Sequence, residues 1–151
     1  MVAPMASYQR RLGETNMMMQ HRWTALVSLL ALLAYFWMSL QVGRARSKCG
    51  INAPAMTGDP VLERAVRVQS NTLEWLPIFL VSLWLFAIYW NELTAAALGL
   101  VWIIGRLLYS AGYMVDPAKR STGFLIQFAA SAALLLGALG KIVYSLSTGG
   151  V

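Results

Sequence analysis

Three polar residues stand at helical spacing where the chain passes from a polar segment into an apolar one. Arg67, Asn71 and Glu74 fall at positions i, i+4 and i+7, so a helix places a cation, an amide and a carboxylate on one stripe. The apolar run that begins at Trp75 indicates that the stripe meets the boundary of a membrane. Such a stripe suits a zwitterionic or anionic ligand. An ordinary solvated helix extension with an internal hydrogen-bond ladder is the alternative.

A second polar stripe interrupts the next apolar segment. Arg106 is the one charge in a stretch of membrane-spanning length, and Tyr109 and Tyr113 follow at i+3 and i+7. Because an arginine at the centre of a spanning helix costs roughly 2.5–3.5 kcal/mol on insertion scales, it normally faces protein or water and has a partner. A snorkelling arginine with interfacial tyrosines is the alternative. Two polar stripes on neighbouring helices predict a pocket, which Arg46 and Arg120 could close.

Four apolar windows must position these residues. They span residues 23–43, 75–91, 93–115 and 121–140. A membrane-spanning helix needs roughly 17–25 mostly apolar residues. The sequence therefore predicts an all-α integral membrane protein, a four-transmembrane-helix up-down bundle. The second helix is expected to begin earlier, near Asp59-Pro60, and to reach into the polar phase.

The rest of the chain divides around this bundle. Residues 1–22 are expected to be an N-terminal extension, in which the run Met17-Met18-Met19 offers a later translation start. Residues 23–146 form one membrane domain and residues 147–151 a tail. The segment 43–58 contains glycines and a proline, which predict a loop. The first apolar run is a full span rather than the short core of a signal peptide, so we expect it to be retained.

Composition excludes several classes of protein. Of 151 residues, 58% are hydrophobic and 12% charged, against about 45–50% and about 25% in soluble domains. A disulfide-rich scaffold is excluded because Cys49 is the single cysteine. The formal charge of +6 (12 Lys+Arg, 6 Asp+Glu) indicates orientation in a membrane and an anionic ligand rather than nucleic acid. Most cations near the spans lie on the first and third loops, which places these loops in the cytoplasm.

Other residues favour structural roles. His21 has no second ligand nearby, so no metal site is predicted. Five tryptophans are expected at lipid-facing or belt positions: Trp23, Trp37, Trp84, Trp90 and Trp102. Two pairs of glycines suggest close helix packing: Gly99 with Gly105, and Gly137 with Gly140.

The polar residues, in the order in which they follow along the chain, resemble the motifs of MAPEG, the family of membrane-associated proteins in eicosanoid and glutathione metabolism. The resemblance covers residues 23–146 and is greatest to the microsomal glutathione transferase and leukotriene synthase types. It is carried by Ser39-Leu40-Gln41-Val42 with Arg46, by Glu63-Arg64, by the run from Arg67 to Glu74 with Pro77, by Gly105-Arg106-Leu107-Leu108-Tyr109 through Gly112-Tyr113, and by Asp116-Pro117 with Lys119-Arg120.

Membership would imply a homotrimer that holds glutathione between neighbouring subunits at the cytoplasmic face. The positions that match the family's glutathione-binding residues are Arg46, Arg67, Asn71, Glu74, Trp75, Arg106, Tyr109 and Tyr113. Arg120 matches the catalytic arginine beside the glutathione sulfur. One position departs from the pattern, since the leukotriene synthase has a tyrosine where this chain has Trp75, so any hydrogen bond through that hydroxyl is lost.

The resemblance also implies an activity. The expected enzyme is a detoxifying transferase that uses glutathione as co-substrate, without a metal, and joins its thiolate to a lipophilic electrophile from the bilayer. Reduction of lipid hydroperoxides is a further activity that the family allows. The alternative is a non-catalytic lipid-binding scaffold of the lipoxygenase-activating-protein type. A small transporter is a third possibility, for which the sequence shows no intramembrane acid relay or pair of broken helices.

Overall fold

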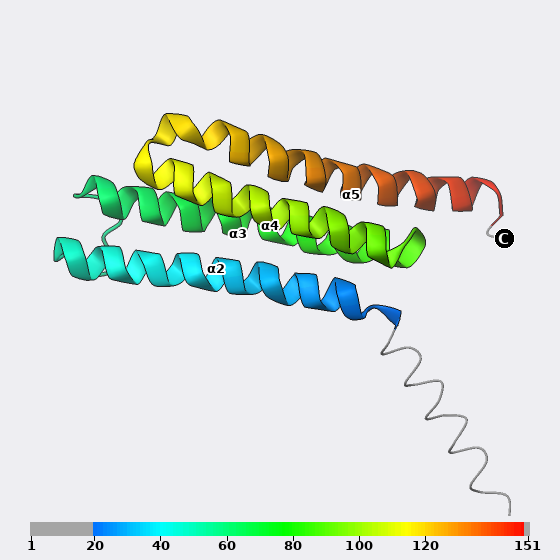
Figure 1. Cartoon of the computed structure of the whole chain (residues 1–151), viewed down its shortest axis with the longest axis horizontal. Helices are drawn as coiled ribbons and strands as arrows, with labels where there is room; N and C mark the ends of the chain where they lie inside the picture. Colours follow the sequence, from blue (N-terminus) through cyan, green and yellow to red (C-terminus); the bar gives the residue numbers. More distant parts are fainter. Residues whose placement is uncertain (1–19, 150–151) are drawn as a thin grey trace, which may run out of the picture.

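The computed structural model describes residues 20–149, which fold as an up-down bundle of long helices (Figure 1). The elements are α2 (Arg22–Cys49), α3 (Pro60–Tyr89), α4 (Glu92–Val115), the short 3-10 helix η1 (Pro117–Arg120) and α5 (Ser121–Ser147). Four candidate membrane spans lie on these helices. The chain is therefore an integral multi-pass membrane protein, and the predicted four-helix architecture is confirmed. The expectations for residues 1–19, including the later translation start, and for residues 150–151 lie outside the described residues.

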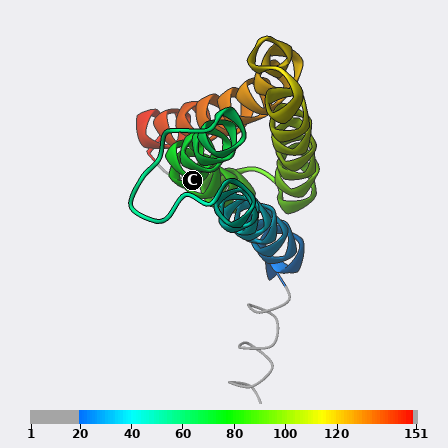
Figure 2. The same ribbon diagram turned by 90° about the vertical axis from the view of Figure 1, so that its left-hand side faces the viewer.

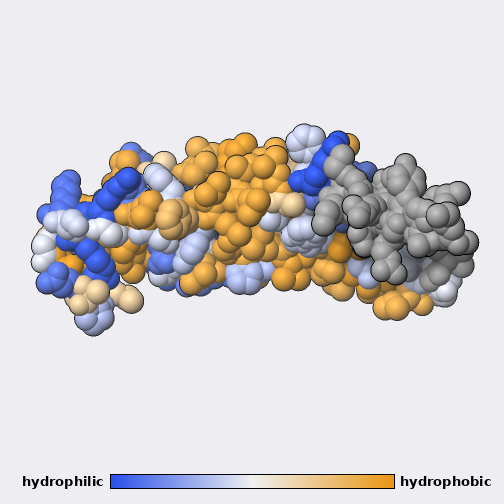
Figure 3. Space-filling model, turned by 90° about the horizontal axis from the view of Figure 1, so that it is seen from below, coloured by the Kyte–Doolittle hydropathy of each residue, from blue (hydrophilic) through white to orange (hydrophobic). Residues whose placement is uncertain are grey.

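The polarity of the surface matches this architecture. Hydrophobic side chains form a broad band across the middle of the molecule, and hydrophilic ones gather at the end that carries the α2–α3 and α4–η1 connections (Figure 3). Figure 2 views the bundle from that end, where the loop between α2 and α3 crosses in front of the helices. The residues of both polar stripes lie toward this end.

Two helix starts follow from ordinary capping chemistry. The Asp59 carboxylate accepts a hydrogen bond from the Val61 backbone N–H (2.7 Å), and Pro60 occupies the first helical position. The predicted early start of α3 is thereby confirmed. Asn91 caps α4 in the same way by accepting from the Thr94 N–H (2.9 Å).

The first helix is longer than the sequence suggested. Residues 44–49 were expected in a loop, but α2 continues through them to Cys49 and ends at Gly50. The reason is that arginine, alanine and lysine are good helix formers, whereas Gly50 is the residue that adopts the left-handed conformation (φ 67°) needed to end the helix. The loop is therefore shorter than expected.

Close packing of α4 on α5 sets the position of the second polar stripe. A Cβ atom on Gly123 would overlap the Tyr109 backbone nitrogen, and one on Gly105 would lie 2.6 Å from the backbone nitrogen of Gln127. Gly137 is similarly tight against Phe86. Gly140, however, would meet no atom within 4 Å if it carried a Cβ, so the expectation of close packing there is wrong.

The core is built around one aromatic stack. The rings of Phe79 and Trp102 lie parallel with centroids 4.0 Å apart, and both side chains are fully buried. The prediction that Trp102 faces lipid is therefore wrong. Trp102 stands one turn before Arg106 on the face of α4 that packs against α3, and this packing decided its environment.

Candidate functional site

The two polar stripes meet at a buried arginine. Arg106 is 0% exposed, and its guanidinium donates from Nη1 to the Asn71 side-chain oxygen (2.9 Å) and from Nη2 to the Asn71 backbone carbonyl (3.1 Å). The same guanidinium lies over the rings of Trp102 and Tyr109, at 5.5 and 5.2 Å from their centroids. Arg106 thus faces protein, and the snorkelling alternative is wrong.

Asn71 also belongs to the ladder along α3. Its Nδ2 donates to Glu74 (3.1 Å), and Arg67 forms an ion pair with the other oxygen of that carboxylate (3.7 Å). The side chains of Arg67 and Glu74 are each 55% exposed. The ladder expected for a simple helix extension therefore exists, but Asn71 links it to the buried Arg106. One side of the stripe is anchored in protein, and the other is open to a ligand.

The short helix η1 brings a further cation to this place. Asp116 accepts a hydrogen bond from the Ala118 N–H (2.9 Å), which starts η1 directly after α4. Arg120, the last residue of η1, lies with its guanidinium 5.7 Å from the Tyr113 ring centroid. The helix η1 thus places the exposed Arg120 beside Tyr113, the last residue of the α4 stripe.

Together these side chains line a partly open cavity of about 250 Å³, whose walls are Arg67, Asn71, Tyr109, Arg120 and Phe124. A neighbouring hollow of about 320 Å³ shares Arg67 and is lined also by Glu63, Arg64 and Tyr113. Residues from α3, α4, η1 and α5 therefore converge on one basic surface that also carries tyrosines and a carboxylate. It has the donors to bind carboxylates and an acceptor to bind an ammonium group.

Aromatic residues form the apolar border of this surface. Trp75 packs edge-to-face against Phe124 and Phe128, with centroids 5.8 and 5.9 Å apart. Trp75 does not line the cavity, whereas Phe124 does. Phe124 was not among the residues predicted from the sequence. The spacing of Phe124 and Phe128, one helical turn apart, was the available signal for an aromatic face on α5.

Arg46 lies apart from the predicted site residues on α3, α4 and η1. Its guanidinium donates to the backbone carbonyl of Ala55 in the α2–α3 loop, and it lines neither hollow of the basic surface. Among residues 20–149, no group of three or more His, Cys, Asp or Glu side chains is arranged to hold a metal ion.

Known proteins include relatives that align with most of this chain. An uncharacterized protein of Synechocystis is 48% identical over 124 residues, which are 82% of this chain and 90% of the relative. Human microsomal glutathione S-transferase 2 is 46% identical over 117 residues (77% and 80%), and mouse leukotriene C4 synthase is 36% identical over 126 residues (81% and 82%). The profile of the MAPEG family matches residues 24–140, and the chain belongs to this family.

Proposed function

We propose that this protein is a membrane glutathione S-transferase that joins the glutathione thiolate to lipophilic electrophiles. The observation that carries the proposal is the cavity lined by Arg67, Asn71, Tyr109 and Arg120 beside the buried Arg106, at the polar end of a membrane bundle. The names of two relatives, microsomal glutathione S-transferase 2 and leukotriene C4 synthase, support it.

The residue types of the cavity complement glutathione. This tripeptide has two carboxylates and one ammonium group. Arginine binds a carboxylate through two parallel N–H groups, which fixes its orientation as well as its charge. Arg67 is the candidate carboxylate ligand on the cavity wall, with Tyr109 and Tyr113 as hydroxyl donors. Arg106, fully buried behind that wall, holds Asn71 in place for the ligand. Glu74, half exposed beside them, is the candidate partner of the ammonium group.

Arg120 has the properties required to activate the thiol. A free thiol has a pKa near 8.5, so only a few per cent is thiolate at neutral pH. A guanidinium keeps its proton in proteins, so Arg120 acts by stabilising the thiolate electrostatically and not as a base. The thiol proton leaves to water, and the sulfur lone pair forms a C–S bond while the leaving group departs with its electron pair. The electrophile reaches the sulfur from the lipid past Phe124 and Phe128.

A homotrimer would complete this site. The Glu74 carboxylate and the Arg67 guanidinium are each half exposed. Arg46 lies outside the cavity of its own chain. We infer that Arg46 reaches the glutathione of a neighbouring subunit, and that the site faces the cytoplasm, where the positive-inside rule places this basic end. With a lipid hydroperoxide in place of the electrophile, two molecules of glutathione would give the disulfide, the lipid alcohol and water.

Conjugation of glutathione to 1-chloro-2,4-dinitrobenzene by the purified protein in detergent tests the proposal. The bound thiolate should give an ultraviolet absorbance that disappears in Arg120→Ala, with a loss of turnover of about a hundredfold. Lys119→Ala is the matched control, because it removes the adjacent exposed cation from the same short helix. If Arg120→Ala keeps full turnover, the activating role is wrong. If the wild type binds no glutathione, the proposed enzyme activity fails and the lipid-binding scaffold takes its place.

A further inference from the structure

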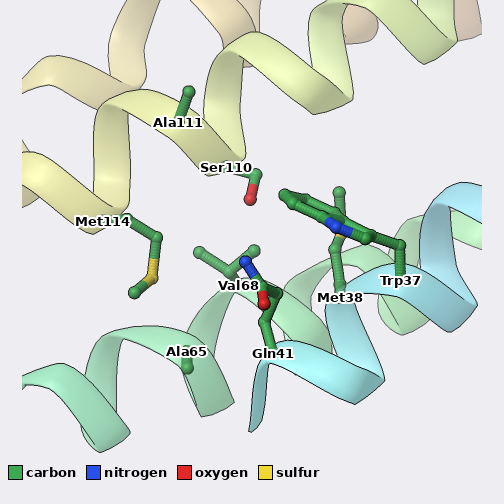
Figure 4. A pocket seen from close by; sticks show the side chains of 8 residues that line it. All are labelled: Trp37, Met38, Gln41, Ala65, Val68, Ser110, Ala111 and Met114. Atoms are coloured by element: carbon green, nitrogen blue, oxygen red, sulfur yellow. The ribbon is translucent and has the colours of Figure 1, made fainter. Parts of the chain in front are cut away.

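A second cavity lies on another face of α3 and α4. It has a volume of about 210 Å³ and opens between α2, α3 and α4, with walls that include Trp37, Met38, Ala65, Val68 and Ser110 (Figure 4). Four of these side chains, all but Trp37, are buried. The cavity is therefore part of the packed structure and not merely a furrow on the lipid-facing surface.

A layer of side chains separates this cavity from the basic one. Met38, Val68 and Tyr109 form a single buried cluster. Tyr109 lines the basic cavity, whereas Met38 and Val68 line the apolar one. An occupant of the apolar cavity therefore has no access to a thiol bound beside Arg120, and its role is distinct from that of the electrophile.

Small side chains create the space. Ala65 on α3 and Ser110 on α4 line the space together with Trp37 of α2, and larger residues at these two positions would fill it (Figure 4). An apolar cavity of about 150 Å³ is known to remain dry and to bind benzene. The present cavity is somewhat larger, so it has room for one alkyl segment and not for two chains side by side.

One end of this cavity is polar and cationic. Figure 4 shows the Ser110 hydroxyl and the Gln41 amide turned toward the open space. The Gln41 side-chain oxygen accepts a hydrogen bond from Arg44 (2.8 Å), and Arg64 donates to the backbone carbonyl of Met114 (3.2 Å). Among the described residues neither arginine forms an ion pair, since the single pair found there joins Arg67 to Glu74. Arg44 therefore stands, without an ion pair, beside the polar end of the apolar cavity, whereas Arg64 lines the neighbouring hollow of the basic surface.

We propose that this cavity binds the alkyl chain of a long-chain fatty acid anion, with its carboxylate toward Arg44. The apolar walls stabilise one chain, the volume excludes a second, and the Arg44 guanidinium selects a carboxylate over a neutral head group. The site lies outside the proposed conjugation chemistry, and no covalent step occurs there.

Quenching of tryptophan fluorescence tests the site directly, because Trp37 forms one wall. The full-length protein in phosphatidylcholine nanodiscs is titrated with a long-chain fatty acid that carries bromine on its chain, since bromine quenches a tryptophan that it contacts. Saturable quenching is expected, and Trp37→Phe should remove the saturable component. The glutathione assay is independent of this signal, so the two proposals can fail separately.

Two pairs of variants assign the signal to the cavity. Ser110→Phe fills the space and should abolish saturable quenching, whereas Leu108→Phe adds the same ring on the exposed face of α4 and should leave it unchanged. Arg44→Gln should weaken binding of the acid by about threefold, as expected for an exposed charge, but not binding of the matching brominated alcohol. Lys48→Gln removes a second cation from the same end of α2, one that does not bond to the cavity-lining Gln41, and is the control.

Three results would overturn the proposal. Ser110→Phe with quenching equal to that of the wild type would mean that the chain binds elsewhere. Brominated phosphatidylcholine that quenches Trp37 to the same level, with no further effect of the acid, would identify an ordinary lipid contact. Equal affinity for the acid and the alcohol in the wild type would show that Arg44 does not select the ligand.

Discussion

The two cavities share walls from α3 and α4, yet their chemistry is opposite. Arg67 faces the basic cavity and its neighbour Val68 the apolar one, and the adjacent Tyr109 and Ser110 divide in the same way. One residue along a helix is a rotation of about 100°, which is enough to change the wall to which a side chain belongs. The buried layer of Met38, Val68 and Tyr109 therefore separates a charged cavity from an apolar one within one bundle.

The largest effect should come from removing the anchor of the basic cavity. Arg106→Leu deletes two hydrogen bonds from a charged group to Asn71, each worth about 1.5–3 kcal/mol to the fold, so the Tm should fall. Glutathione affinity should fall by about tenfold or more, because Asn71 on the cavity wall loses its orientation. Isothermal titration calorimetry measures this affinity. Binding of the fatty acid should persist, because Arg106 does not line the apolar cavity. Arg106→Lys keeps the charge but not both bonds, and an intermediate loss is expected; unchanged affinity in Arg106→Leu would contradict this role.

The layer between the cavities can be displaced through the glycine that supports it. Gly123→Ala puts a Cβ onto the Tyr109 backbone nitrogen, and backbone cannot move aside as a flexible side chain does. Overpacking of this kind costs about 1–3 kcal/mol, so the Tm in detergent should fall and both cavities should bind more weakly. Gly140→Ala on the same helix meets no atom within 4 Å and is the control. A Tm equal to that of the wild type in Gly123→Ala would refute the close approach of α4 and α5.

A smaller effect is expected at the open edge of the basic cavity. Glu74→Gln removes an ion pair whose partners are each 55% exposed, so stability should change by less than about 1 kcal/mol. Glutathione binding should nevertheless weaken several-fold if the carboxylate binds the ammonium group. An analogue of glutathione without its amino group separates ligand binding by Glu74 from its structural role. This analogue should bind the wild type and Glu74→Gln with the same affinity. Equal loss for both ligands would assign Glu74 a structural role.

The smallest expected effect is the pH dependence of stability that Asp59 contributes from the loop between α2 and α3. Hydrogen bonds from the Cys49 thiol and then from the Val61 N–H lower the pKa of Asp59 below its usual range. Because the folded-state pKa is the lower one, the stabilisation is complete above the unfolded value of about 3.9 and is lost as the pH falls through the folded-state pKa. The Tm of the wild type should drop across this range more than that of Asp59→Asn. Parallel curves would exclude this contribution.

The sequence predicted those features that depend on local order. Helical periodicity placed Arg67, Asn71 and Glu74 on one stripe, and the pair Asp59-Pro60 marked the start of α3, as the structure confirms. It could not predict which faces would meet. The burial of Trp102 and the bonds between Arg106 and Asn71 require the packing of α3 against α4, which joins residues 35 apart in the chain.

The amino-acid sequence by itself determined that this chain crosses a membrane on four helices, because apolar windows and charges act within one segment at a time. It also determined the set of cations available for an anionic ligand. Only the tertiary structure decided how these residues are shared between two cavities, since that depends on which side chains on different helices come into contact. The small residues Ala65 and Ser110 leave space only because Trp37 faces them from α2.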